Sequence, residues 1–290
     1  MSLLFRKGKN NIMKRIVTIQ DISGVGKCSL TVALPIISAM GVETSVLPTA
    51  VLSTHTAFKD FTFRDLTSDI QPILKHWKDQ KFTFDAIYTG YLGSKEQIDL
   101  MSNMFDYYKK QGTLILVDPC MADNGSLYPG FTKGFAHEMA GLCGKADIIV
   151  PNMTEASYLL DIPYVENGYD EAYVKDILQK LAALGAKKVA IKGITLKEGL
   201  YGVYSYDSTT KEYTSYYHKR LQQNFHGTGD IFASVVVGAL MKDYTLEKAL
   251  SLAADYVVES IEETLKSDNP NWYGVNFETA FPYLLKRLYQ

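Results

Sequence analysis

Residues 16–40 read IVTIQDISGVGKCSLTVALPIISAM, and the alternation within this stretch decides the expected fold. The apolar run IVTIQ at 16–20 predicts a buried strand, and the stretch from about Ser29 to Met40 predicts a helix. Gly24 and Gly26 favour a turn between the two. The stretch therefore predicts one strand-turn-helix unit.

The same alternation continues through the chain. Apolar runs that predict strands lie at 44–52, 84–90, 113–119, 147–152 and 187–193, and helix-like stretches lie near 69–80, 95–110, 170–184 and 229–265. Short strands that alternate with helices indicate β-α-β units and a mainly parallel sheet. Such sheets bind ligands beyond the carboxyl ends of their strands, so the residues after each run are the first candidates for a site.

The segment at 199–220, GLYGVYSYDSTTKEYTSYYHKR, has a different pattern. Aromatic and β-branched residues flank the turn-prone Asp207-Ser-Thr-Thr-Lys, which predicts an antiparallel hairpin. The expected fold class is therefore α/β, with a mainly parallel central sheet and this hairpin appended to it.

The segment DISGVGKCS at 21–29 shares features with a phosphate-binding P-loop. A P-loop needs a glycine five residues before its Gly-Lys pair, because consecutive backbone N–H groups must surround the phosphates. Asp21 occupies that position here, and its carboxylate would repel a phosphate. We therefore expect the phosphate site elsewhere in the chain, and not at Lys27.

Length, charge and cysteine content limit the function classes. A chain of 290 residues without a Pro-, Gly- or Ser-rich linker is expected to form one domain over 13–290, with 1–12 an N-terminal extension or expression remnant before Met13. The formal charge of −2 gives no broad surface for nucleic acid or an anionic membrane, so a small-molecule substrate is favoured. Three scattered cysteines favour a reducing cytoplasm over a disulfide framework or a zinc cluster. No apolar run approaches the roughly 20 residues of a spanning helix.

The segment NFHGTGDIFASVVVGAL at 224–240 carries the strongest signal for chemistry. Gly227, Thr228 and Gly229 precede a long apolar helix, and their N–H groups can point into one concavity where a phosphoryl group would be stabilised. Asp230 would lie beside it and take the proton from a substrate hydroxyl that attacks a γ-phosphate. The alternative is an ordinary helix N-cap in which Asp230 accepts free N–H groups.

Charged residues also follow other predicted strands. Asn152 and Glu155, three residues apart in NMTE, would face one side of a helix start. Glu155 would hold Mg²⁺ or orient its water ligand, with Asp118 as a second carboxylate. The structural alternatives are a capping box for the first pair and a simple turn at Asp118-Pro119. Lys192 would reach nucleotide phosphates, or else lie solvated on the surface.

Together these residues resemble the ribokinase-like superfamily of small-molecule kinases, and in particular its pyridoxal kinase branch, from Met13 essentially to the C-terminus. The motifs that carry the resemblance are GTGD at 227–230, NMTE at 152–155, VDP at 117–119, GYLGS at 90–94, STHT at 53–56 and IKG at 191–193. The resemblance implies a three-layer sandwich with helices on both faces of the sheet, usually assembled as a homodimer. It also implies transfer of the γ-phosphate of ATP to the 5′-hydroxymethyl group of a vitamin B6 vitamer.

Residue roles are implied by the same resemblance. Asp230 would be the catalytic base, and residues 227–229 would form the oxyanion cradle. Asp118 and Glu155 would organise Mg²⁺ and the phosphates. The residues implied at ATP are Asp118, Asn152, Glu155, Lys192, Thr228 and Gly229. The residues implied at the vitamer are Asp21, Ser23, His55, Thr56, Tyr91 and Asp230. A monovalent cation is a further candidate cofactor.

The vitamer side departs from the family pattern at Asp21. Many pyridoxal kinases carry a serine there, and DISGVGK is similar to the Asp-Ser-Gly-Gly turn of hydroxymethylpyrimidine kinases. The pyrimidine enzymes usually end the anion-hole motif in cysteine, whereas Asp230 is of the pyridoxal type. Asp21 would pair with a protonated ring nitrogen or an amine, or else cap a turn. His55 would contact the ring, or else be a structural histidine.

The leading hypothesis is therefore an ATP-dependent vitamin B6 kinase. Two alternatives stay open: a hydroxymethylpyrimidine (phosphate) kinase of thiamine synthesis, and a non-catalytic nucleotide-binding regulator built on the same fold. Asp230 argues against the regulator, because a protein that transfers no phosphate has no use for a base at this position.

Overall fold

The computed structural model describes residues 13–221, 223 and 225–290, and the extension expected at 1–12 lies outside this range. Nine strands of the described chain form one sheet in the order β11-β10-β9-β8-β5-β4-β1-β2-β3. They are β1 (Arg15–Val25), β2 (Glu43–Thr54), β3 (Phe63–Asp65), β4 (Ala86–Thr89), β5 (Leu114–Val117), β8 (Ile148–Ile149), β9 (Lys188–Ile194), β10 (Leu200–Asp207) and β11 (Glu212–Lys219). A separate small hairpin consists of β6 (Ala122–Asp123) and β7 (Ser126–Leu127).

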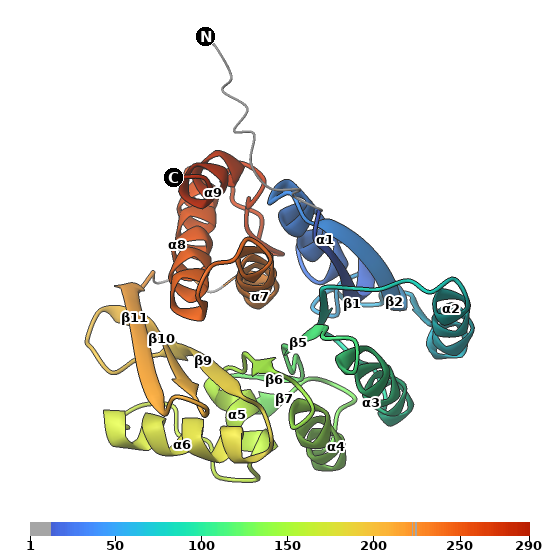
Figure 1. The fold of residues 1–290 in the computed structure, drawn as a ribbon. Coiled ribbons are helices and arrows are strands. Elements are labelled where there is room, and N and C mark those ends of the chain that lie inside the picture. Colours follow the sequence, from blue (N-terminus) through green and yellow to red (C-terminus); the bar gives the residue numbers. More distant parts are fainter. Residues whose placement is uncertain (1–12, 222, 224) are drawn as a thin grey trace.

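Helices cover both faces of the sheet (Figure 1). One face carries α2 (Thr67–Asp79), α3 (Lys95–Lys109), α4 (Lys133–Cys143), α5 (Met153–Leu159) and α6 (Glu171–Ala183). The other carries α1 (Leu30–Ala39), α7 (Thr228–Leu240), α8 (Leu246–Leu265) and α9 (Phe281–Leu288). Within the described residues, none of the helices combines the length and the apolar character that crossing a membrane requires.

Strand directions follow the sequence prediction. β1, β2, β4, β5, β8 and β9 run parallel, whereas β10 and β11 form an antiparallel hairpin that pairs with β9. Both faces of the parallel strands are buried: in β5, Ile115 and Val117 enter one core cluster and Leu116 enters the other. An unbroken apolar run such as LILV is what a parallel strand between two helical layers needs.

The first strand is longer than the sequence pattern predicts. β1 runs to Val25, so Asp21 and Gly24 lie within the strand and the turn to α1 is confined to residues 26–29. β2 pairs with this extension as far as Val25 opposite Thr54, after a register shift beside Asp21. The prediction of a turn across DISGVGK was therefore wrong for its first half, because pairing with β2 outweighs the local preference of a glycine.

The order of the strands reverses beside β1. The chain passes from β1 to β2 on one side and then crosses to β4 on the other, which makes a topological switch point between the carboxyl ends of β1 and β4. Asp21 and Tyr91 lie there, in the outer part of β1 and just after β4. Farther along this edge come Asp118 after β5, Asn152 after β8 and Lys192 in β9. The fold therefore brings residues predicted for both ligands to one edge of the sheet.

Two glycines allow the ends of α4 and α6 to meet backbone to backbone. A Cβ at Gly185, where φ is +128°, would lie 2.3 Å from the carbonyl oxygen of Gly144.

We expect Gly185→Ala to lower the free energy of unfolding by roughly 2–5 kcal/mol, the sum of backbone strain and overpacking. Gly112→Ala is the matched control, because Gly112 has φ +84° and a Cβ there meets nothing within 4 Å. It should cost only ~1–2 kcal/mol. Equal losses in chemical denaturation would contradict the proposed close contact.

Candidate active site

The N-terminus of α7 has the geometry of an anion site. Its N-cap, Gly227, has φ +79°, and no described side chain caps the helix. The first N–H groups of a helix have no partner within it, so those of residues 228–230 remain available to a phosphoryl group. A Cβ at Gly227 would lie 1.7 Å from the carbonyl oxygen of Lys27, so this position accepts only glycine.

Asp230 does not cap its own helix. Its Oδ2 accepts the backbone N–H of Ser29 at 2.9 Å, at the start of α1, and the residue is 8% exposed. Burial raises the pKa of Asp230 to about 7, against the opposing effect of the Ser29 N–H. The negative charges of Asp118 and Asp21 add to the rise. A carboxylate with a pKa near neutrality can both accept and release a proton at physiological pH.

Lys192, which is partly buried, and Asp118, which is buried, form an ion pair beside this helix end. The Nζ of Lys192 donates to both carboxylate oxygens of Asp118, at 2.7 and 2.8 Å. Burial works to lower the pKa of Lys192, but the charges of Asp118 and Glu155 outweigh it and hold the pKa above its usual value. A Cβ at Gly229 would lie 3.4 Å from Nζ. The ammonium is therefore not on the solvated surface but next to the N-terminus of α7.

Asn152 and Glu155 form the capping box that their spacing allows. The Asn152 side chain accepts the Glu155 N–H at 2.8 Å, and Glu155 Oε2 accepts the Asn152 N–H at 2.7 Å. Glu155 is 2% exposed, and burial raises its pKa to about 8 while Lys192 acts to lower it. The capping box, which was the structural alternative, is thus present. The Glu155 carboxylate also interacts electrostatically with Lys192 and Asp118.

A cavity of about 370 Å³ connects these groups. Its charged region contains Asp118, Asn152, Glu155, Lys192 and residues 227–230. Its apolar region contains Leu221, Phe225, Val257 and Ile261. A nucleotide needs both environments, since its phosphates require polar partners and its base requires apolar contact. The contribution of α8 to this cavity was not predicted from the sequence, because its residues there are ordinary members of an apolar helix face.

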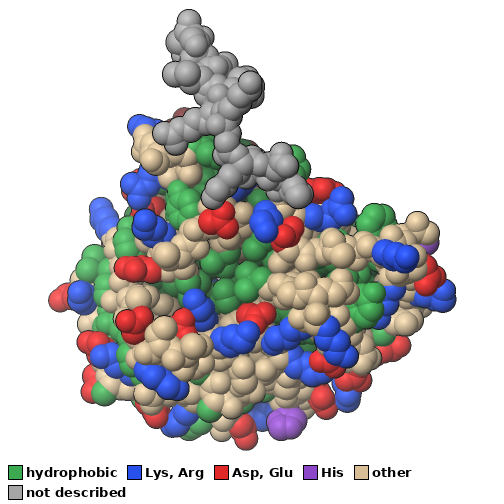
Figure 2. Space-filling model, viewed as in Figure 1, with side chains coloured by type: hydrophobic (Ala, Val, Ile, Leu, Met, Phe, Trp, Pro, Cys, Tyr) green, Lys and Arg blue, Asp and Glu red, His purple; other side chains and the backbone are tan. Residues whose placement is uncertain are grey.

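The charged residues that line the cavity are mainly acidic. Asp118, Asp123, Glu155 and Asp230 stand against Lys192 among the described lining residues. On the face shown in Figure 2, by contrast, basic and acidic side chains are interspersed. A polyphosphate would be repelled here unless a cation accompanied it.

The acid set fits a magnesium ion that arrives with a nucleotide. Mg²⁺ is usually held by one or two carboxylates together with substrate phosphates, and not by a cage of protein ligands alone. Asp118 and Glu155 offer such a pair on the cavity wall. Within the described residues, no group of three or more His, Cys, Asp and Glu side chains is arranged to hold a metal. A pair of carboxylates on the cavity wall suits a Mg²⁺ ion whose other ligands come from the phosphates of a nucleotide and from water.

The residues expected at the vitamer do not line this cavity, apart from Asp230. Ser23 Oγ donates to Asp21 Oδ2 at 2.9 Å, and both residues are buried. Burial raises the pKa of Tyr91 to about 12, and the charge of Asp21 adds to the rise, so the two side chains share one environment. Asp21 also acts on Asp230 through its charge. Thr56, in contrast, is exposed and its side chain makes no hydrogen bond with the described residues.

Aromatic side chains that the sequence did not single out surround His55. The ring centroids of Phe58, His226 and Trp272 lie 4.9, 5.1 and 5.9 Å from that of His55. The Nε2 of His55 lies 3.1 Å from the carbonyl oxygen of Tyr273. His226 also lines the cavity, so the aromatic cluster lies between the STHT segment at 53–56 and the cavity. Only His226, adjacent to GTGD, carried a signal that sequence reasoning could have used.

Lys27 is directed away from the cavity. Its Nζ donates to Glu278 Oε2 at 2.7 Å and to Asn276 Oδ1 at 3.2 Å, and the residue does not line the cavity. A P-loop lysine would face the phosphates. The geometry therefore agrees with the prediction that DISGVGKCS is not a P-loop.

Comparisons with known proteins give the family. The model of the phosphomethylpyrimidine kinase family matches residues 36–273. Pyridoxal kinase PdxY of Pasteurella multocida (strain Pm70) is 26% identical over 285 residues, which cover 94% of this chain and 96% of that protein. Pyridoxal kinase from Lactobacillus plantarum is 29% identical, with a TM-score of 0.85 over 94% of this chain and 97% of that one.

A higher identity is found with a protein of Bacteroides thetaiotaomicron that is provisionally named a phosphomethylpyrimidine kinase. The two are 38% identical, with a TM-score of 0.91 over 95% of each chain. A second crystal form of that protein, with a TM-score of 0.89, contains pyridoxal. These likenesses confirm the predicted fold class, an α/β fold with a mostly parallel central sheet. Because the family model spans most of its length, the chain belongs to the phosphomethylpyrimidine kinase family, whose relatives here include pyridoxal kinases of the ribokinase-like superfamily.

Proposed function

We propose that this protein is an ATP-dependent kinase that phosphorylates the 5′-hydroxymethyl group of a vitamin B6 vitamer, namely pyridoxal, pyridoxamine or pyridoxine. The observation that carries the proposal is Asp230, a buried carboxylate at the N-terminus of α7 with a pKa raised to about 7. A non-catalytic regulator would gain nothing from a proton acceptor at this point. Membership of a kinase family supports phosphoryl transfer as the reaction class.

ATP would occupy the cavity, with its base in the apolar region beside Val257 and Ile261. The γ-phosphate would then approach the free N–H groups of residues 228–230. Lys192, oriented by two hydrogen bonds from its ammonium to Asp118, would contribute a positive charge near the phosphates. Binding would therefore rest on backbone donors and one fixed cation.

Asp230 would act on the acceptor hydroxyl. As the 5′ oxygen forms its bond to the γ-phosphorus, its proton passes to Asp230, and the bond from that phosphorus to the β–γ bridging oxygen breaks. The electron pair of the broken bond leaves on ADP. N–H groups at the start of α7 would stabilise the charge on the oxygens of the transferred group. The products are the phosphorylated vitamer, ADP and a proton that Asp230 later releases.

Mg²⁺ would neutralise part of the phosphate charge when it is bound with ATP. Asp118 and Glu155 are the residues that would hold it, directly or through water, because they are the buried carboxylates opposite Lys192 on the cavity wall. A monovalent cation and a homodimer stay predictions drawn from the family resemblance.

The choice of a B6 vitamer over a pyrimidine is supported by Asp230, which is of the pyridoxal type, and by a relative, and Asp21 is compatible with a vitamer. Burial raises the pKa of Asp21, and a buried carboxylate is best compensated by a cation such as a protonated ring nitrogen or an amine. The Bacteroides protein, at 38% identity, has been crystallised with pyridoxal. The alternative is hydroxymethylpyrimidine or its phosphate, which the name of the matching family favours.

A comparison of substrates tests the proposal directly. ADP release is measured with pyridoxal, pyridoxamine, pyridoxine and hydroxymethylpyrimidine at saturating MgATP. We expect at least one vitamer to have a kcat/KM about tenfold or more above that of the pyrimidine, a difference of ~1.4 kcal/mol. The reverse order would assign the protein to the pyrimidine kinases, and no turnover with any of the four would refute both.

Asp230→Asn should lower kcat by roughly 10²–10⁴ and leave ATP binding intact, because the amide cannot accept the proton. The wild-type kcat should also rise with pH up to about 7 and then level off, since the group with this pKa must be ionised to act. Initial rates and ATP titrations across this pH range check both points. Near wild-type turnover in the variant would exclude Asp230 as the base.

Lys27 and Lys192 should differ in their effect on ATP. Lys27→Ala should keep the ATP KM within about threefold, or ~0.65 kcal/mol, because its ammonium faces Glu278. Lys192→Met should raise the ATP KM about tenfold or more. Since Lys192→Met leaves Asp118 buried without a partner, a thermal unfolding scan of each variant checks that the fold is retained. A severe ATP defect confined to Lys27→Ala would restore the P-loop interpretation.

A further inference from the structure

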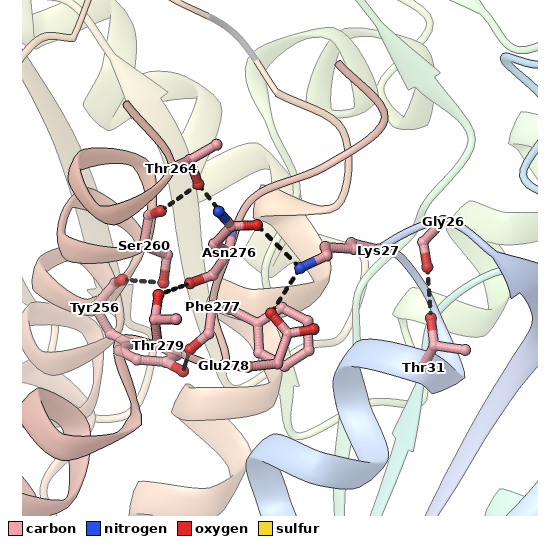
Figure 3. A network of polar contacts seen from close by, with 10 residues as sticks. All are labelled: Gly26, Lys27, Thr31, Tyr256, Ser260, Thr264, Asn276, Phe277, Glu278 and Thr279. Atoms are coloured by element: carbon pink, nitrogen blue, oxygen red, sulfur yellow. Dashed lines mark hydrogen bonds and ion pairs between the residues drawn. The ribbon is translucent and has the colours of Figure 1, made fainter. Parts of the chain in front are cut away.

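Lys27 joins the turn before α1 to the chain segment that follows α8 (Figure 3). Its ammonium donates to Glu278 at 2.7 Å and to Asn276 at 3.2 Å, and it lies 5.6 Å from the ring centroid of Phe277. The Lys27 side chain is 19% exposed. A carboxylate, an amide oxygen and an aromatic ring thus fix one partly buried cation.

The segment at 276–279 is itself anchored to α8. The Tyr256 hydroxyl donates to the carbonyl oxygen of Phe277 at 2.7 Å, and the Asn276 N–H donates to the Thr264 hydroxyl oxygen at 2.7 Å (Figure 3). Tyr256 and Thr264 are fully buried. The partners of Lys27 are therefore held to a long core helix and do not move independently of it.

The turn that carries Lys27 is closed by a local contact. The Thr31 hydroxyl lies within hydrogen-bond distance of two carbonyl oxygens, 2.8 Å from that of Cys28 and 3.1 Å from that of Gly26. A Cβ at Gly274 would lie 2.4 Å from the Cβ of Lys27, so the chain after α8 packs directly on the turn. Contacts that restrain the Lys27 side chain therefore also restrain the backbone of the turn at 26–29.

The same turn touches the proposed catalytic groups. The carbonyl oxygen of Lys27 packs against Gly227, and the N–H of Ser29, two residues later, donates to Asp230. Ser29 has φ +51°, a left-handed conformation that a residue other than glycine keeps where its surroundings impose it. The surrounding contacts therefore hold the turn in a conformation that is unfavourable for the isolated segment. In this conformation the Ser29 N–H points at the Asp230 carboxylate.

We propose that Lys27 is a positioning residue for phosphoryl transfer: its tether to Asn276 and Glu278 holds the turn at 26–29 so that the Ser29 N–H fixes the orientation of Asp230. The inference rests on the proposed function, because it takes Asp230 as the base. Without the tether the turn relaxes, the carboxylate loses its donor, and the acceptor hydroxyl meets a misplaced base. ATP binding, which depends on other groups, is unaffected.

Four variants test the tether. Lys27→Met removes the ammonium and keeps most of the aliphatic chain, Glu278→Gln removes the carboxylate, and the double variant combines them. Lys27→Arg is the conservative variant. The matched control is Arg287→Met, which breaks an ion pair of 2.9 Å between Arg287 on α9 and Asp255 on α8, in the same region of the molecule and without contact to the turn.

The kinetic constants of the variants distinguish a positioning role of Lys27 from a general contribution to the stability of the fold. Lys27→Met should lower kcat about tenfold while the ATP KM stays within about threefold, since misplacement of a catalytic group costs turnover and not nucleotide affinity. Lys27→Arg should retain kcat within about threefold. The double variant should be no worse than Lys27→Met, because both substitutions remove one shared contact. Wild-type kcat in Lys27→Met, or an equal loss in Arg287→Met, would overturn the proposal.

A second measurement needs no substrate. Amide hydrogen exchange of the peptide that spans 26–31 should be faster in Lys27→Met and in Glu278→Gln than in the wild type, and unchanged in Arg287→Met. If the wild type phosphorylates no vitamer, the proposed function fails while this result still reports on the tether. If turnover is present and exchange at 26–31 is unchanged in both variants, the tether fails while the proposed function stands. Glu278 is 49% exposed in its side chain, so Glu278→Gln keeps the test valid if Lys27→Met does not fold.

Discussion

The hydrogen bond from the Ser29 N–H to Asp230 joins residues that are 201 positions apart in the sequence, and the proposed chemistry depends on it. Burial alone would push the pKa of this carboxyl far up and leave it protonated, whereas several N–H donors would hold it so low that it could not take a proton. One donor, together with the charges around it, leaves the pKa at about 7. The fold achieves this balance by packing the start of α1 against the start of α7, and each of these helix ends carries a residue with a positive φ.

The largely buried ion pair of Lys192 and Asp118 is the second constraint on the site. Removing two charges from water is costly, and the cost is recovered only when the partners are well oriented. Here the ammonium donates to both carboxylate oxygens and stays charged, with Glu155 adding to the negative field. Among the described residues that line the cavity, acids nevertheless outnumber lysines. This imbalance is unfavourable for a free polyphosphate and favourable for one that carries a divalent cation, which agrees with the proposal of MgATP as the phosphoryl donor.

Local patterns predicted the main strands of the sheet and the strand ends at which the candidate site lies, but they did not predict α4, α9, β3 or the small hairpin of β6 and β7. The run LILV could be identified as a buried strand, and GTGD as a helix start, because each signal is contained in a few consecutive residues. The extension of β1 to Val25 was not predictable in this way, since it depends on pairing with β2. The contact of Lys27 with Glu278 joins residues 251 positions apart, and neither local sequence contains a pattern that would predict it. Two of the rings around His55, those of His226 and Trp272, were missed for the same reason, because they come from distant parts of the chain.

Structural and catalytic interpretations of a helix-start acid are often treated as rivals, and two residues of this protein separate them physically. Glu155 and Asp230 both occupy the third position of a helix, after the N-caps Asn152 and Gly227. Glu155 reaches back to its own N-cap, and its two oxygens accept N–H groups of Asn152 and Met121. Asp230 has the shorter side chain and accepts from Ser29 of another helix through Oδ2, while its Oδ1 accepts no hydrogen bond from the described residues. The capping box therefore fixes the Glu155 carboxylate at the start of its own helix, where its charge acts on the neighbouring groups. The oxygen of Asp230 that accepts no hydrogen bond from the described residues stays available to a substrate hydroxyl, and Asp230 is for this reason the residue proposed as the base.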